Sequence, residues 1–292
     1  MTLRSDFWLF TFGAVLLSAL GACATPVPTL SSERIASIVA SPERSAADRT
    51  NDLRRKPEPM LAFIGLRPGM VALDVSAGGG YTTELLARAI GPSGIVHGQS
   101  QPRDPARAAP APAAPEGNSA PNIAAPAPAP ATAASAPPTR TSAMALAERE
   151  ARLRSANVAA APIVAVVQKF ETPVPAALAS NSLDLVTLMF NYHDLGYLGV
   201  DRAAMNRALF QALKPGAHYV IADHSGRAGT GISESGTLHR IEEAFLRKEV
   251  EAAGFKLAAE GMFLRNPNDP RDQNTPNPPQ PKDEFVLKFV KP

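Results

Sequence analysis

Cysteine is almost absent from this sequence of 292 residues, because Cys23 is the only one. A single cysteine excludes an internal disulfide, and its place near the N-terminus leaves the rest of the chain without a thiolate nucleophile or a cysteine-based metal site. A strong charge of one sign is also missing, since the formal net charge is +2. No run of Lys and Arg interleaved with aromatic residues occurs, so we expect no nucleic acid among the partners of this protein.

Long apolar runs are scarce as well, and the one at the N-terminus indicates export. It covers Phe7–Leu20 after Arg4 and is too short to cross a bilayer comfortably, as is typical of a signal peptide. The run leads into Leu20-Gly21-Ala22-Cys23, which resembles a bacterial lipobox. A plain secretory signal and an N-terminal membrane helix are the alternatives. The lipobox resemblance implies a signal peptide over residues 1–22 and a lipoprotein of the cell envelope, held to the membrane by acylated Cys23 and facing the periplasm.

Removal of such a signal leaves 270 residues, which suits one α/β domain with a tether and an insertion. We expect the tether and the start of an N-terminal helix in residues 23–40, and the domain in residues 41–292. From about 101 to 140 the chain is rich in Ala and Pro, a composition typical of polyproline-like or disordered segments. We therefore predict a disordered insertion that bulges from the domain.

Apolar periodicity predicts a regular alternation of strands and helices. Helical spacing covers residues 31–55, and a short helix follows from Pro57. The predicted strands cover residues 70–75, 94–98, 163–167, 183–190, 218–222, 255–259 and 284–290, and the later helices cover 81–90, 143–154, 203–213 and 238–253, with a turn at 214–216. This order predicts a doubly wound α/β fold with a mostly parallel, seven-stranded sheet and an antiparallel last strand.

A glycine-rich loop lies between the first of these strands and its helix, in the segment Asp74-Val75-Ser76-Ala77-Gly78-Gly79-Gly80-Tyr81. Glycines let a ligand approach the backbone, and the N-terminus of a helix offers free N–H groups. Asp74, Gly78 and Gly80 match the pattern D-x-G-x-G-x-G, with Ser76 in place of the first glycine. Together with Leu66-Arg67-Pro68-Gly69 and Leu183-Asp184-Leu185-Val186, the loop resembles that of class I S-adenosylmethionine-dependent methyltransferases, and within them a bacterial subgroup labelled predicted methyltransferases.

The resemblance implies a Rossmann-like methyltransferase fold that binds S-adenosylmethionine. The cofactor-binding residues it implies are Asp74, Ser76, Gly78, Gly80, Tyr81, Gln99 and Asn191. Gln99 ends the second strand, where most members of the family have an acidic residue that accepts hydrogen bonds from both ribose hydroxyls. The glycine spacing, and the absence of an acidic residue at this point, argue against a nicotinamide-binding Rossmann domain.

Polar residues also follow the fourth and fifth predicted strands, as Asn191-Tyr192-His193-Asp194 and Asp223-His224-Ser225. Ligands of open α/β sheets bind beyond the carboxyl ends of the strands. We predict His193, Asp194 and His224 as catalytic residues, with either histidine as general base. Purely structural roles, such as capping of the next turn, are the alternative for each of them.

The resemblance implies methyl transfer to a small-molecule acceptor of unknown identity. Two other functions stay open. One is a non-catalytic envelope binding protein, because export separates the chain from a methyl donor that is made inside the cell. The other is a metal-assisted hydrolase, which requires His193, Asp194, His224 and His239 to converge. No H-x-x-x-H pattern or cysteine pair supports a metal, so we expect none, and we expect His239 to be structural or to contact substrate.

Overall fold

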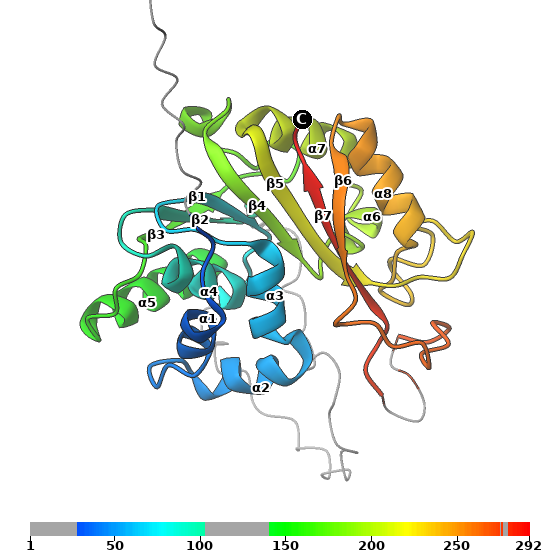
Figure 1. Ribbon diagram of the computed structural model, residues 1–292. Coiled ribbons are helices and arrows are strands. Elements are labelled where there is room, and N and C mark those ends of the chain that lie inside the picture. Colours follow the sequence, from blue (N-terminus) through cyan, green and yellow to red (C-terminus); the bar gives the residue numbers. More distant parts are fainter. Residues whose placement is uncertain (1–27, 103–139, 275, 277–279) are drawn as a thin grey trace, which may run out of the picture.

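The computed structural model describes residues 28–102, 140–274, 276 and 280–292 (Figure 1). The predicted signal peptide, Cys23 and most of the Ala/Pro-rich insertion lie outside these residues, so the expectations for them stay predictions. Among the described residues, no helix has the length and apolar character needed to span a bilayer.

Seven strands form one sheet in the order β3-β2-β1-β4-β5-β7-β6. They are β1 (Val71–Val75), β2 (Ile95–Ser100), β3 (Ile163–Val167), β4 (Leu183–Met189), β5 (Leu213–His224), β6 (Lys256–Gly261) and β7 (Glu284–Val290). The pairs among β1 to β5 are parallel, and β7 runs antiparallel to both of its neighbours. The predicted α/β fold, with a mostly parallel seven-stranded sheet and an antiparallel last strand, is confirmed.

Helices cover both faces of the sheet (Figure 1). They are α1 (Ser32–Val39), α2 (Ala46–Arg55), α3 (Pro57–Ile64), α4 (Tyr81–Ile90), α5 (Ser142–Ser155), α6 (Asp194–Tyr197), α7 (Arg202–Ala212) and α8 (Glu243–Ala252), with a 3-10 turn at Ala176–Leu178. Side chains alternate between the faces along a strand. In β1, Ala72 packs in a cluster with α1, α3, α4 and α5, whereas Leu73 and Val75 pack with α7 and α8.

The helical spacing predicted over residues 31–55 is interrupted, so that prediction was wrong in its middle. Residues 40–45 separate α1 from α2. Pro42 lies in this break and has no N–H to continue a helix, and the hydroxyl of Ser45 accepts a hydrogen bond from the N–H of Asp48 as the cap of α2. Ile35 and Ile38 of α1 are buried in the core, so the packed fold already includes this helix.

The starts of β5 and of α8 also differ from the prediction, in each case because the segment pairs with a distant part of the chain. Strand β5 begins at Leu213 and runs through the predicted turn, because Leu213 pairs with Leu183 of β4 and Gly216 donates a hydrogen bond to the carbonyl of Lys291. Helix α8 begins at Glu243 rather than Leu238, because Ile241 is extended and forms a parallel bridge with Ser225. Tertiary contacts override local helix propensity at both places.

Candidate functional site

The junction of β1 and α4 presents exposed backbone donors. Ser76, Gly78 and Gly80 have φ values of 58°, 53° and 80°, and Gly78 and Gly79 are exposed to solvent. In the described part of the chain, no protein group accepts a hydrogen bond from the N–H of Gly78 or Gly79. The N-cap of α4, Gly80, brings no side-chain hydrogen bond to the first turn. Free N–H groups at a helix N-terminus attract carboxylates and other anions, so this side of the loop is suited to an anionic group.

Asp74, the first residue of the glycine-rich segment, is buried and bonded to protein. Its two carboxylate oxygens accept hydrogen bonds from the hydroxyls of Thr83 (2.6 Å) and Thr187 (2.7 Å). Burial raises the pKa of Asp74 to about 6, against the opposing effect of both hydroxyls. The carboxyl group thus connects α4 to β4 and fixes the base of the loop.

Gln99 braces the loop from the end of β2. Its side chain is fully buried, and its amide oxygen accepts a hydrogen bond from the N–H of Ser76 at 3.0 Å. Its amide nitrogen donates to the carbonyl of Gln168 at 2.7 Å. A contact of Gln99 with a ribose therefore requires this brace to open.

Tyr81, the first residue of α4, is covered by the N-terminal helices. Its hydroxyl donates to Asp52 of α2 at 2.6 Å, and its ring lies below the guanidinium groups of Arg44 and Arg55, at 5.7 and 5.4 Å from their central carbons. Helix α2 therefore forms the outer wall on this side of the glycine-rich loop.

Helix α5 occupies the carbonyl side of the loop, a feature that the sequence did not predict because the Ala/Pro-rich insertion separates the two segments. The hydroxyl of Ser142 donates to the carbonyl of Gly78, and Arg149 donates to the carbonyl of Gly79. A Cβ atom on Gly80 would lie 2.7 Å from Leu146, so any other residue there would have to displace side chains of α5. The carbonyl groups of Gly78 and Gly79 are thus bonded to α5, while the N–H groups of the same two residues stay open.

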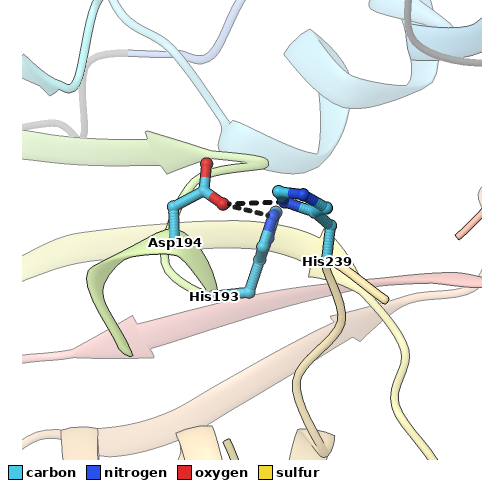
Figure 2. Close-up of side chains that lie close together, drawn as sticks. All are labelled: His193, Asp194 and His239. Atoms are coloured by element: carbon cyan, nitrogen blue, oxygen red, sulfur yellow. Dashed lines mark hydrogen bonds and ion pairs between the residues drawn. The ribbon is translucent and has the colours of Figure 1, made fainter. Parts of the chain in front are cut away.

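A second cluster lies at the carboxyl ends of β4 and β5. The ring of His193 is buried, and its Nδ1 lies 2.6 Å from Asp223 Oδ1 while its Nε2 lies 3.0 Å from Asp194 Oδ1. The backbone N–H of His193 also donates to Asp223. His239, from the segment before α8, directs its Nδ1 to the same oxygen of Asp194, at 3.1 Å. Figure 2 shows both rings pointing to this one carboxylate oxygen.

The two carboxylates around His193 determine its charge. Burial by itself would lower the pKa of His193, but Asp223 and Asp194 outweigh burial and raise the pKa to about 10. The pKa of Asp194 is lowered, because His193 and His239 outweigh the effect of its burial. In this arrangement His193 carries a proton at neutral pH. The predicted role of general base requires that proton to be displaced first.

Asn191 connects the histidine cluster to the glycine-rich loop. Its amide nitrogen donates to Asp194 Oδ2 at 2.7 Å, and its amide oxygen accepts from the hydroxyl of Ser76 at 2.7 Å. The sequence placed Ser76 and Asn191 at one edge of the sheet, and the structure brings them into direct contact.

His224 points away from the oxygen that His193 and His239 share. Its ring centroid is 5.3 Å from that of His193, but its Nδ1 lies 3.0 Å from Glu284, which also accepts a hydrogen bond from Arg54. Of the four residues proposed to converge, three therefore meet at one point, and His224 faces α2 and β7 instead.

His224 lines a cavity of about 390 Å³, which sequence reasoning missed. Its walls come from α2, the end of β5 and the polar loop between β6 and β7, and include Leu53, Arg54, Lys56, Leu264, Arg265, Asn266 and Glu284. None of the residues of the glycine-rich loop lines it. The walls come from segments that are far apart in the sequence, and no single pattern marks them.

Comparison with solved structures identifies the fold. A methyltransferase from Aquifex aeolicus that depends on S-adenosylmethionine has a TM-score of 0.50 and 15% identity, covering 90% of this chain and 100% of that one. A TehB-like methyltransferase from Corynebacterium glutamicum has a TM-score of 0.44 and 15% identity, covering 84% of this chain and 96% of that one. An arsenic(III) methyltransferase from Chlamydomonas reinhardtii has a TM-score of 0.45 and 15% identity, covering 77% of this chain and 64% of that one. No protein-family model and no curated protein matches the sequence. The chain has the Rossmann-like fold of the Aquifex methyltransferase.

Proposed function

We propose that this protein is a methyltransferase that uses S-adenosylmethionine and acts on a small-molecule acceptor. The observation that carries the proposal is the pair of open backbone donors at Gly78 and Gly79, just before the N-terminus of α4, at the end of β1 in a sheet of the order 3-2-1-4-5-7-6.

The residues of the loop fit the amino-acid end of the cofactor. Free N–H groups at Gly78 and Gly79 suit its carboxylate, and a Cβ atom on Gly79 would meet no protein atom within 4 Å, so this face of the loop has room for a ligand. When bound, S-adenosylmethionine supplies a methyl group on a positively charged sulfur. Asn191 is bonded to the loop through Ser76, and His193 and Asp194 lie next to it. These three residues are therefore the ones proposed to face the acceptor.

Calorimetric titration of the full-length chain in detergent, with S-adenosylmethionine and S-adenosylhomocysteine, tests the proposal. We expect both ligands to release or absorb heat with one site per chain. Gly79→Val is the discriminating variant, because its side chain meets open space in the protein and the φ of Gly79 is not in the left-handed region. We expect Gly79→Val to keep the wild-type free energy of unfolding and to weaken the ligand at least about tenfold, or about 1.4 kcal/mol.

A non-catalytic binding protein with the same fold is the second candidate, and the state of Gln99 favours it. The side chain expected to hold the ribose is buried and bonded at both ends to backbone. The 390 Å³ cavity also lies away from the glycine-rich loop. Absence of heat with millimolar S-adenosylmethionine and S-adenosylhomocysteine, from a chain that unfolds cooperatively, would support this candidate against the methyltransferase.

We propose further that Cys23 is acylated and holds the protein in the cell envelope on the periplasmic side. The lipobox-like sequence before Cys23 supports this location. In cells, the wild-type chain is expected in the membrane fraction with a mass that includes acyl chains. Cys23→Ala is expected to remain unprocessed, and recovery of wild-type protein from the cytoplasm would contradict the anchor.

A further inference from the structure

His193, Asp194 and His239 have the composition and spacing of a metal site (Figure 2). One ligand atom from each residue lies within 4.8 Å of the other two. Two imidazole nitrogens and one carboxylate oxygen are ligands that first-row transition metals accept. Zinc bonds of about 2.0–2.1 Å place tetrahedral ligand atoms about 3.3 Å apart, and Asp194 Oδ1 already lies 3.0 and 3.1 Å from the two nitrogens. We propose that these residues bind a first-row divalent transition metal, with Zn²⁺ as the ion to test.

The groups behind the three ligands are those that a metal site requires. Ligating histidines usually donate their second ring N–H to a carboxylate, which fixes the tautomer and the ring. Asp223 takes this place for His193, since it accepts at Nδ1 and leaves Nε2 for the metal. Asn191 holds the second oxygen of Asp194 by donating to Oδ2, so Oδ1 stays directed to the cluster. Two of the three ligands are therefore held by an outer partner.

His239 is held at the cluster by a strained backbone and by its buried neighbour. Its φ of 51° lies in the left-handed region, which non-glycine residues adopt at a cost that recurs at functional sites. Arg240 is fully buried and donates to the carbonyl of Ser225 and to Asp269, and Ile241 bridges to Ser225. The bridge between Ile241 and Ser225 is also the reason that α8 begins at Glu243 rather than at Leu238. Residues 238–242 were predicted as helix but are not helical in the structure, and His239 of this segment contacts Asp194.

Charge and access also suit a divalent ion. Asp223 is buried and Asp194 is partly buried beside His193. An ion that binds Nε2 of His193 displaces the proton on that nitrogen to solvent, and its two positive charges then balance both carboxylates. The side chain of His239 is 38% exposed, whereas that of His193 is 2% exposed, so an ion reaches the cluster from the side of His239. Three protein ligands leave a position on a tetrahedral ion for water or for an oxygen atom of a substrate. This inference does not rest on the proposed methyltransferase activity.

The test uses the full-length chain in detergent, stripped of metal by a chelator and titrated with Zn²⁺. Wild-type protein is expected to bind one Zn²⁺ per chain, by calorimetry and by elemental analysis after gel filtration. His239→Ala removes a partly exposed ligand without opening the core, and we expect affinity to fall at least about 100-fold. Asn191→Ala removes an outer partner and is expected to cost about 10- to 100-fold. His218→Ala, a histidine of β5 outside the cluster, is the matched control and should bind as wild type does.

A second measurement distinguishes a specific metal site from weak adsorption of the ion to the protein surface. Co²⁺ in place of Zn²⁺ is expected to give visible absorption bands in the wild type and in His218→Ala, and to lose them in His239→Ala. The proposal is overturned if wild-type protein binds no Zn²⁺, if His239→Ala binds it as tightly as wild type does, or if His218→Ala weakens it equally. Titration with S-adenosylmethionine is a separate measurement, so its failure leaves the zinc result standing.

Discussion

The buried carboxyl group of Asp74 makes the stability of this protein depend on pH in a direction opposite to the usual one. Its pKa is raised by burial from 3.8 to about 6. Between these values the native state holds a proton that the unfolded chain has released. Stability contributed by this proton is therefore lost as pH rises from about 4 to about 6, and the loss amounts to about 3 kcal/mol at 1.36 kcal/mol per pKa unit.

Asp74→Asn isolates this effect, because an amide does not titrate. Urea unfolding, followed by circular dichroism at pH 4, 5, 6 and 7, gives the free energy of unfolding of both proteins. The difference, variant minus wild type, is expected to rise by about 2 kcal/mol from pH 4 to pH 7, because part of the total change lies below pH 4. The altered hydrogen bonds to Thr83 and Thr187 add an offset that does not vary with pH. A difference that stays constant across this range would refute the argument from burial.

Two further substitutions and one control variant test the packing around the site by the same unfolding assay. Gly80→Ala places a Cβ 2.7 Å from Leu146 at a φ of 80°, so we expect a loss of about 2–5 kcal/mol from backbone strain and overpacking; Gly229→Ala, with the same φ and open space, should lose only the strain of about 1–2 kcal/mol. Arg240→Ala leaves the buried Asp269 without its cation, and we expect a loss of about 3–5 kcal/mol. Equal losses for Gly80→Ala and Gly229→Ala would contradict the packing around Gly80.

Local sequence patterns were sufficient to predict the sheet. Apolar runs of four to eight residues, bounded by turns, predict buried strands, and the run predicted over residues 70–75 proved to be β1, an inner strand of the sheet. The errors at the start of β5 and at the start of α8 fell where distant segments pair. Leu213 joins β5 through its pairing with Leu183, and Ile241 stays extended through its bridge to Ser225. Neither pairing leaves a periodic signal in the local sequence.

The candidate site was only partly predictable for a related reason. The topology of an open α/β sheet places Asn191, His193 and Asp223 at one edge, and the structure has them there. Which side chains then meet depends on rotamers and on loops. The sequence predicted His224 as catalytic and His239 as structural or in contact with substrate, but the bridge at Ser225 brings His239 to Asp194 while His224 faces Glu284.

Hydrogen bonds through Asn191 make the glycine-rich loop and the histidine cluster one connected unit. Ser76 donates to Asn191, and Asn191 donates to the carboxylate that both His193 and His239 approach. A ligand that forms a hydrogen bond with the hydroxyl of Ser76 breaks the bond between Ser76 and Asn191. An ion that binds Asp194 displaces the carboxylate to which Asn191 donates. We therefore expect two such ligands to be coupled in free energy, and linkage then requires each to change the affinity of the other by the same factor. Affinity for either ligand must therefore be measured with the other both absent and present.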